Sequence, residues 1–339
     1  MPFNVINSIA KLPKKMAVIV GTNTNAPSLA QLGSVSTINN YYQPAMSDSG
    51  QYIIATVGSA TIGTVLLSTN YGSTFSSILT FTNLINYSCA MSGTGQYMVV
   101  MVNNGYMYRS GNYGVNWAQV TNISTTQNWT SVALSPNGQY CLASGNNPTN
   151  NVYVSANFNT STPTFTQVSL YANMNNGPQN NAVSSTGQYM IQLNWSAADG
   201  IAISTNYGVS FSKLTVANIG ITGTSFNGIT MTPDKSSVYV AIGGNGLYKS
   251  TNLFSGSPMF TQITTETFTE QTWNKVVVSS DGTYIIASTS LNTYYSKNSG
   301  STWTKVYVGR ITFMAMSSDA HYVIASNSDR SSSLLYSNT

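Results

Sequence analysis

Short apolar runs separated by polar turns recur along the whole chain, and none of them follows the periodicity of a helix. In the segment AMSGTGQYMVVMV (90–102), a run of small residues meets a Gly-containing turn and then a nearly continuous apolar run. An apolar run of this kind without alternation indicates a strand that is covered on both faces. Seven copies of the segment are recognisable, at 45–57, 90–102, 133–144, 182–193, 230–242, 277–288 and 315–326. The chain is therefore predicted to be a repeat protein built from small sheets.

A tyrosine marks the apolar run of each copy, and its spacing measures the repeat. Successive tyrosines are 45, 43, 49, 50, 45 and 38 residues apart, at Tyr52, Tyr97, Tyr140, Tyr189, Tyr239, Tyr284 and Tyr322. A period in the forties with four strand-like runs per unit is typical of radial four-stranded blades, whereas a β-solenoid needs shorter repeats. We therefore predict an all-β fold, a seven-bladed β-propeller of four-stranded antiparallel blades. Its single domain is expected over residues 27–339, with blades starting near 45, 90, 133, 182, 230, 277 and 315.

A second motif, Ser-x-Asn-x-Gly-x-x-aromatic, recurs out of phase with the first. Clean copies are LSTNYGSTF (67–75), RSGNYGVNW (109–117), ISTNYGVSF (203–211) and YSKNSGSTW (295–303). In such a turn the Asn side chain accepts backbone N–H groups, Gly supplies a positive φ and the aromatic ring fills the space between neighbouring blades. The residues assigned to this structural role are Asn70, Gly72, Asn112, Gly114, Asn206, Gly208, Asn298 and Gly300; two further boxes, at Asn157 and Asn252, contain insertions.

These boxes resemble the Asp-box, Ser-x-Asp-x-Gly-x-x-Trp, of the BNR-repeat family of sialidase, sortilin-type and photosystem-assembly propellers. The resemblance extends over nearly the whole chain and implies a sialidase-like or sortilin-like propeller, with each box between the third and fourth strands of a blade. All six boxes carry Asn where the family has Asp. Asn keeps the acceptor oxygen without the charge, so we expect a structural turn and no metal site.

The two ends of the chain are predicted to complete one blade together. The segment 28–47 aligns with 116–135, which makes residues 29–32 a fourth strand without its own first three. The C-terminal segment 314–339 supplies three strands without a fourth, so the N-terminal strand should pair with it and hide the sheet edges. Residues 1–26 are interpreted as a basic tail that could assemble the protein into a larger particle, and the place of MAVIVGTN (16–23) stays open.

Charge is unusually sparse, because only 6% of the 339 residues are Asp, Glu, Lys or Arg, against about 25% in typical domains. The net charge of +4 comes largely from three lysines in the N-terminal tail, so nucleic-acid binding is not expected. No apolar run approaches the roughly 20 residues of a membrane span, and the N-terminal apolar run is shorter than a signal-peptide core. Cys89 and Cys141 read as buried thiols, and we predict no cofactor. The virion or the cytoplasm is the favoured location.

Strand order assigns the loops to two faces. The first-to-second-strand turns and the Asn boxes share one face, here called the box face, where Asp48, Asp234, Asp281 and Asp319 are expected to form tight turns. The other connections form the opposite face, here called the loop face. Charged residues predicted to bind a partner there are Asp199, Glu266, Glu270, Arg310, Asp329 and Arg330, with Trp195 and Trp273 near the same rim, where Tyr41, Tyr42 and Trp129 are also expected.

The function most consistent with this pattern is a non-catalytic binding or structural module that contacts a protein or a glycan. The low charge and the Asn-, Ser- and Thr-rich composition are similar to proteins of large DNA viruses, which suggests a virion surface or host-attachment component. The resemblance to sialidases implies three arginines on one face, but the chain has only three in all and Arg109 precedes a box. Two alternatives stay open: an intracellular assembly factor, and an exo-acting glycoside hydrolase that uses Glu266 and Glu270 with Asp199 or Asp329.

Overall fold

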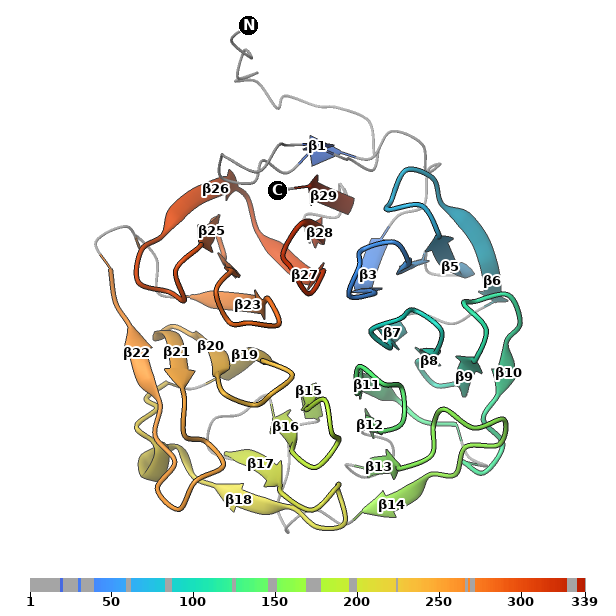
Figure 1. Cartoon of the computed structure of the whole chain (residues 1–339), viewed down its shortest axis with the longest axis horizontal. Helices are drawn as coiled ribbons and strands as arrows, with labels where there is room; N and C mark the ends of the chain where they lie inside the picture. The colour runs from blue at the N-terminus through green and yellow to red at the C-terminus, as the bar shows by residue number, and fades with distance from the viewer. Residues whose placement is uncertain are drawn as a thin grey trace, which may run out of the picture.

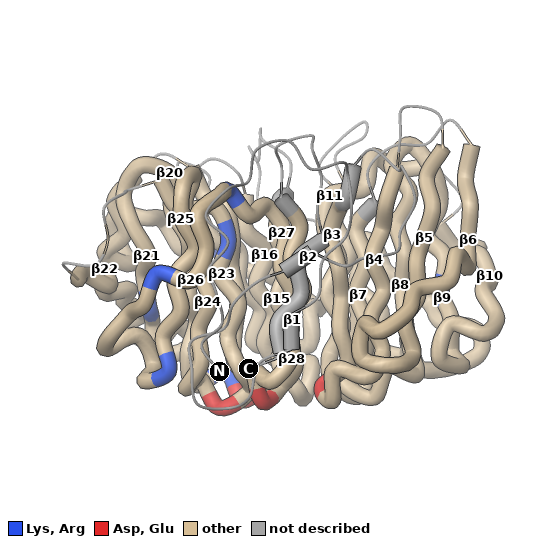
Figure 2. The backbone as a smooth tube through the Cα atoms, turned by 90° about the horizontal axis from the view of Figure 1, so that it is seen from above, with Lys and Arg blue, Asp and Glu red and all other residues tan. Residues whose placement is uncertain are grey.

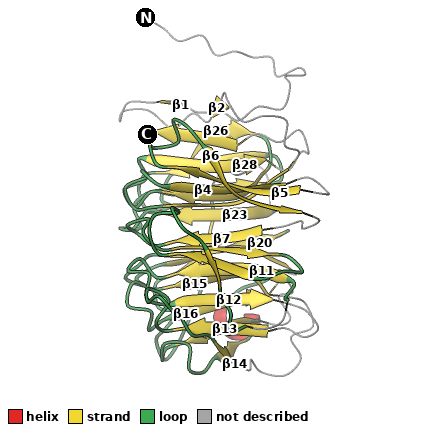
Figure 3. Cartoon of the chain, turned by 90° about the vertical axis from the view of Figure 1, so that its right-hand side faces the viewer, coloured by secondary structure: helices red, strands yellow, loops and turns green. Residues whose placement is uncertain are grey.

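The computed structural model places seven small antiparallel sheets radially in a ring (Figure 1). It describes residues 19–20, 30–31, 40–58, 62–82, 87–123, 126–145, 151–168, 178–194, 200–223, 225–265, 268, 272–327 and 334–338. The first strand of each sheet lies nearest the axis and the last lies at the outer rim (Figure 1). Seen from the side, the strands run across the thickness of the disc and the loops lie at its two faces (Figure 3). The prediction of a seven-bladed β-propeller with four-stranded antiparallel blades is confirmed.

Blades 1 to 6 each take their four strands from consecutive chain segments. Blades 1 to 3 consist of β3 (Asn40–Met46), β4 (Ile53–Gly58), β5 (Ile62–Ser68) and β6 (Ser76–Thr82); β7 (Tyr87–Met91), β8 (Met98–Val102), β9 (Met107–Ser110) and β10 (Ala118–Gln119); and β11 (Trp129–Leu134), β12 (Cys141–Gly145), β13 (Asn151–Ser155) and β14 (Thr166–Val168). Blades 4 to 6 consist of β15 (Pro178–Val183), β16 (Met190–Asn194), β17 (Ile201–Ser204) and β18 (Ser212–Leu214); β19 (Ser225–Met231), β20 (Val238–Gly243), β21 (Gly246–Ser250) and β22 (Thr261–Ile263); and β23 (Trp273–Val278), β24 (Ile285–Thr289), β25 (Asn292–Ser296) and β26 (Thr304–Val308). A 3-10 helix, η2 (Val216–Ile219), connects blades 4 and 5. The inner strands begin three to five residues before the blade starts expected from the repeats.

Blade 7 combines the two ends of the chain, as predicted. It contains β27 (Ile311–Met316), β28 (Tyr322–Asn327) and β29 (Leu334–Asn338), and β2 (Ala30–Gln31) pairs antiparallel with the outer edge of β29. The short strand β1 (Ile19–Val20) pairs with the same edge in the parallel direction. Two residues of the segment interpreted as a tail therefore belong to the blade 7 sheet.

A ring of backbone hydrogen bonds joins the first-to-second-strand turns of neighbouring blades around the axis. Its five bonds are Ser318 N–H to Asp48 O (2.9 Å), Asp48 to Gly93 (2.7 Å), Gly93 to Pro136 (2.8 Å), Ser185 to Pro233 (2.7 Å) and Ser280 to Ser318 (2.8 Å). The two remaining junctions start at Pro136 and Pro233, which have no N–H to donate. This ring also closes blade 7 onto blade 1, independently of the N-terminal strands.

The Asn boxes form the turns between third and fourth strands, through one repeated set of bonds. In blade 1, Asn70 Oδ1 accepts the Ser68 hydroxyl (3.0 Å) and the Thr74 N–H (2.9 Å), while Gly72 N–H donates to Ser68 Oγ (2.9 Å). Gly72 has a φ of 75°, and Tyr71 before it also has a positive φ, 58°. The Ser-to-Asn bond recurs in all six boxes, at 2.9–3.1 Å in the other five, formed by Ser110, Ser155, Ser204, Ser250 and Ser296.

The insertions in the boxes of blades 3 and 5 leave the turn intact. There the Asn accepts an N–H seven residues later instead of four: Thr164 to Asn157 (2.9 Å) and Met259 to Asn252 (3.0 Å). Three extra residues are therefore looped out while the Asn keeps its role. The assignment of the Asn boxes to structural turns agrees with these contacts.

The sequence repeat assigns its shared tyrosine wrongly in blade 5, because Tyr239 lies two residues beyond the equivalent position. In six blades the N–H of the tyrosine after the first turn donates to the hydroxyl of the turn Ser, as in Tyr52 to Ser47 (3.0 Å). In blade 5 the equivalent N–H is that of Ser237, which donates to Thr232 Oγ1 (3.0 Å). Tyr239 lies inside β20 and is fully buried. Blade 5 thus lacks the shared tyrosine.

Candidate functional site

The box face and the loop face lie where the sequence predicts them. In five blades a box residue donates its backbone N–H to the first turn of the same blade, as in Tyr71 to Gln51 (3.1 Å) and Tyr207 to Gln188 (3.1 Å), so boxes and first turns share a face. All acids of the described residues lie along this one side of the disc (Figure 2). The charged residues that the structure describes on the opposite side are all cationic (Figure 2).

Most of the side chains predicted to bind a partner lie outside the described residues: Asp199, Glu266, Glu270, Asp329, Arg330 and Trp195. Arg310 is described and exposed, directly before β27 on the loop face. The glycoside hydrolase hypothesis depends on the carboxylates of Glu266 and Glu270 with Asp199 or Asp329. These lie outside the described residues, so it stays a prediction.

Trp273 does not lie at an open rim. It is 1% exposed and packs with residues of blades 5 and 6, including Tyr239 and Tyr294. The strand register shifts between Trp273 and Lys275, and at this bulge the indole is held between the blades. Trp129 is buried in the same way in blade 3, and its indole N–H donates to Gly105 O (3.1 Å). Neither indole is available to a partner.

The acids of the box face are held in turns, with one exception. Asp234, Asp281 and Asp319 each accept a backbone N–H two residues later, at 2.9–3.0 Å. Hydrogen bonds of this kind lower the pKa of Asp234 and, against desolvation, of Asp281. Asp48 lies in the first turn of blade 1, as expected, but Ser49 makes the side-chain contact of that turn, while the backbone of Asp48 takes part in the ring. Desolvation raises the pKa of its carboxyl.

An exposed patch on the loop face combines apolar and cationic side chains. Leu291 is 60% exposed in the turn between β24 and β25, and Val308 is 71% exposed at the end of β26. The Gly309 N–H donates to Leu291 O (2.7 Å), which holds the two segments together, and Arg310 follows directly. We call Leu291, Val308 and Arg310 the blade 6 patch.

A lysine inside the ring of inner strands is the most unusual charged group of the described structure. Lys275 Nζ donates to Asn180 Oδ1 of β15 (2.6 Å) and lies 5.9 Å from the centre of the Phe313 ring of β27. Blade 7 adjoins blade 6, but blade 5 lies between blades 4 and 6 (Figure 1). The bond to Asn180 therefore takes the lysine side chain past blade 5, along the interior that the inner strands enclose. Inner-strand side chains such as Ala133 and Val277 are partly exposed, which shows that solvent reaches this interior.

Glycine in blade 5 leaves the space that Lys275 needs. A Cβ atom at Gly228 would lie 3.1 Å from Lys275 Cα and 3.4 Å from its Cδ. Around this lysine the amides are linked: Asn180 Nδ2 donates to Asn227 O (3.3 Å) and Asn227 Nδ2 to Trp273 O (2.6 Å). The amide nitrogen of Asn274 is buried without a hydrogen-bond partner. Lys275, Asn180, Gly228 and Phe313 are called the Lys275 site.

The Lys275 side chain is partly exposed to the solvent that reaches the ring interior. Desolvation still lowers its pKa, to about 8, and no carboxylate of the described residues compensates this effect. The sequence contained a signal for this residue that was missed. Seven inner-strand positions lie four residues before the turn Ser or Thr, and only one of them is charged: Gln43, Ser88, Ser131, Asn180, Gly228, Lys275 and Phe313.

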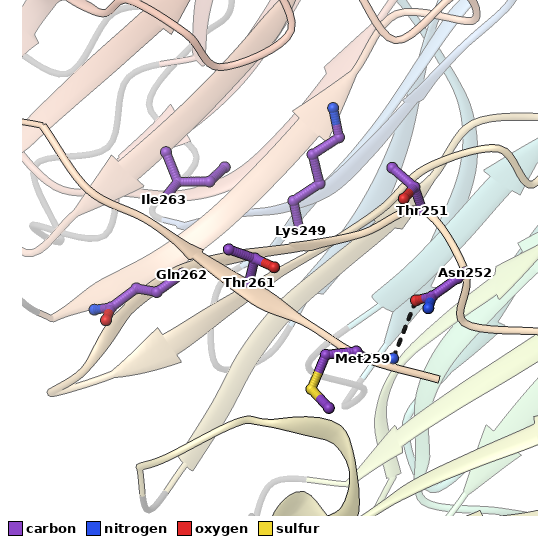
Figure 4. A pocket seen from close by; sticks show the side chains of 7 residues that line it. All are labelled: Lys249, Thr251, Asn252, Met259, Thr261, Gln262 and Ile263. Atoms are coloured by element: carbon purple, nitrogen blue, oxygen red, sulfur yellow. Dashed lines mark hydrogen bonds between the residues drawn. The ribbon is translucent and has the colours of Figure 1, made fainter. Parts of the chain in front are cut away.

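A shallow depression of about 280 Å³ on blade 5 does not qualify as a site of chemistry (Figure 4). It is lined by Lys249, Thr251, Asn252, Met259, Thr261, Gln262 and Ile263, none of them acidic. The Asn252 amide faces the Met259 backbone across it, as the box turn requires. Lys249 Nζ donates to Ser299 O of blade 6 (3.5 Å) and lies 5.3 Å from the Tyr239 ring centre. These groups are already used by the fold.

Within the described residues, no group of three or more His, Cys, Asp or Glu side chains is placed to hold a metal ion. Over the same part of the chain, no helix is long and apolar enough to cross a membrane.

No protein-family model matches the chain, and no curated protein matches it in sequence. Among solved structures, it is similar to the β-propeller domain of Cps50 (Swd1) from Myceliophteria thermophila. The TM-score is 0.63 at 10% sequence identity, over 93% of this chain and 100% of that domain. A likeness at this identity shows the fold alone.

Proposed function

We propose that the protein is a non-catalytic propeller module that binds a partner protein through the loop face, at the blade 6 patch. The observation that carries this proposal is the position of Leu291 and Val308, two exposed apolar side chains on adjacent segments beside Arg310. Arginine is enriched at binding hot spots, and burial of the two neighbouring apolar side chains against a partner would remove their surface from water. A glycan partner is the less favoured form, because aliphatic side chains offer sugars neither stacking nor hydrogen bonds.

The box face also exposes apolar side chains, but they are dispersed or already packed. Val115 and Val209 are 75% and 76% exposed, yet they belong to blades 2 and 4 and are separated by blade 3. Tyr71 packs against Tyr322 of the preceding blade, with ring centres 5.2 Å apart. Nothing in the structure explains the exposure of the two valines, which makes them useful controls.

The sparse charge and the Asn-, Ser- and Thr-rich composition support a place in the particle of a large DNA virus, as a surface or host-attachment component. The basic N-terminal segment, with Lys11, Lys14 and Lys15, would then contact the rest of the particle. Mass spectrometry of purified particles tests this part of the proposal, and absence of the protein from them would refute it.

The docking face is tested by immobilising the protein and quantifying, by mass spectrometry, what it retains from an extract of its host cells. We expect Leu291→Asp with Val308→Asp to abolish retention of the specific partner. Val115→Asp with Val209→Asp, a matched pair of equally exposed positions on the box face, should leave it unchanged. The reverse result would move the binding surface to the box face, and circular dichroism melting checks that both variants fold.

A further inference from the structure

Lys275 is a cation that the described structure leaves without a counter-charge. Its Nζ has three N–H donors, and one of them is bound, to the neutral Asn180 amide. Taking an ammonium even partly out of water is unfavourable unless it is paired or keeps hydrogen-bond partners. A hydrophobic residue at this position would avoid the cost, as Phe313 does in blade 7. Among the described residues, nothing offsets the cost of this charge to folding.

The described acids cannot supply the missing charge. Asp48, Asp234, Asp281 and Asp319 all lie in first-turn segments on the box face. Lys275 is the third of the six residues of β23, in the half of the strand nearer the loop face. The loop face is therefore the nearer side from which an anion can approach it.

We propose that the Lys275 site binds a carboxylate that enters the ring interior from the loop face. The inference deepens the proposed function and rests on it for the source of the group, an acidic side chain or chain terminus of the docked partner. The carboxylate accepts the N–H groups of the ammonium that no described residue binds, and it neutralises the charge. Asn180 holds the ammonium in place, and Gly228 leaves the lysine stem room to lie across blade 5.

The site differs from a fully exposed lysine in two physical respects. The ammonium is only partly exposed, inside the ring, where an ion pair is stronger and less screened by salt than on the open surface. The Phe313 ring centre lies 5.9 Å from the ammonium, within reach of a cation–π contact.

The proposal is tested by measuring the pKa of Lys275 directly, by NMR of protein labelled at lysine Cε and Nζ. The chain has nine lysines, so the spectrum is simple, and the spectrum of Lys275→Met assigns the signal. The probes are acetate and the peptide acetyl-Gly-Glu-Gly-amide at about 100 mM, against chloride at equal ionic strength. Acetate represents a free carboxylate, and the peptide represents a side chain carried by a partner.

We expect the pKa of Lys275 to rise by about 0.5 or more with each probe, because a bound carboxylate favours the charged form. From a starting value of about 8, probe binding should weaken as the pH rises above that value and the ammonium loses its proton. Exposed Lys297 should not respond. An unchanged Lys275 pKa with both probes would refute the proposal, and a response to acetate without the peptide would limit the site to free carboxylates and refute a partner as the source.

The competing possibility is that a carboxylate of the chain's own loop before β23 already occupies the site. In that case Lys275 of the unliganded protein would have a pKa near the ordinary lysine value. That pKa would fall only in the variant Glu266→Gln with Glu270→Gln. That result would also overturn the proposal. The blade 6 patch variant Leu291→Asp with Val308→Asp separates the two proposals, since it should abolish partner retention and leave the acetate effect intact.

Discussion

The two faces of the disc use polar side chains in different ways. On the box face, Asn70 and Asp281 bind the backbone of their own turns, and the first turns bind one another around the axis. On the loop face, no acid of the described residues lies beside the cations Lys275 and Arg310, and Leu291 and Val308 remain exposed. Geometry thus explains the residues of one face and leaves those of the other unexplained. Residues that the fold does not need are where binding is to be sought.

The largest effect is expected from removing residues 1–33, which tests whether the box face alone can hold the ring closed. The deletion removes β1 and β2 and leaves the outer edge of β29 unpaired, although the Ser318–Asp48 bond remains. We expect a melting temperature lower by more than about 10 °C and a tendency to aggregate, since an open edge templates strand pairing. Differential scanning calorimetry and light scattering measure both. A monomer with an unchanged melting temperature would show that the box-face ring suffices.

The second largest effect is expected from Trp303→Ala, at the end of the blade 6 box. The indole is 6% exposed, lies between blades 5 and 6 and donates to Gly300 O (2.9 Å). Its removal should cost about 3–5 kcal/mol of unfolding free energy. Trp117 makes the same bond in blade 2 but is only partly buried, so Trp117→Ala should cost less. Urea denaturation compares the two, and equal losses would mean that burial is not what the box aromatic contributes.

The box face could be predicted from sequence because local backbone geometry dictates its residues. Asn70 and Gly72 are required by the turn itself, so their spacing survives in every clean copy. The same rule would have corrected the error in blade 5. The turn hydroxyl binds the N–H five residues later, which leads from Thr232 to Ser237 and not to Tyr239.

The loop face could not be predicted to the same extent, because its geometry depends on contacts between blades. The bulge at Trp273 buries a side chain that composition places at a rim, and no local pattern announces it. Lys275 meets residues 95 and 38 positions away in sequence, Asn180 and Phe313, so its environment exists only once the ring has closed. The only indication in the local sequence is that Lys275 is the one charged residue among the seven equivalent inner-strand positions.

A smaller effect is expected when a single box residue is compared with a single loop-face residue. Asn298 Oδ1 accepts the Thr302 N–H (2.8 Å) and the Ser296 hydroxyl (3.0 Å), so Asn298→Ala removes the acceptor of two donors. We expect a loss of about 1–2 kcal/mol in unfolding free energy. Arg310→Ala should stay within about 0.5 kcal/mol, as is usual for an exposed side chain without structural contacts. If Arg310→Ala were the more destabilising of the two, the division of roles between the faces would be wrong.

The smallest effect in stability, with a clear effect in hydrogen exchange, is expected from Pro233→Ala. The proline interrupts the backbone ring, and alanine restores an N–H directed at blade 6, like the one that Ser280 donates to Ser318 (2.8 Å). The new hydrogen bond should contribute about 0.5–1.5 kcal/mol, which the greater freedom of the unfolded chain offsets by about 0.4–1 kcal/mol. Unfolding free energy should therefore change by less than about 1 kcal/mol, while the new amide exchanges as slowly as that of Ser185. Pro258→Ala, in the box insertion of blade 5, is the control. It raises the conformational entropy of the unfolded chain by the same amount but adds no hydrogen bond to the ring, so the unfolding free energy should fall slightly. If the amide of residue 233 exchanged at the rate of an unprotected loop, the alanine N–H would not bind blade 6. The five hydrogen bonds would then be separate contacts and not parts of one ring that the fold imposes.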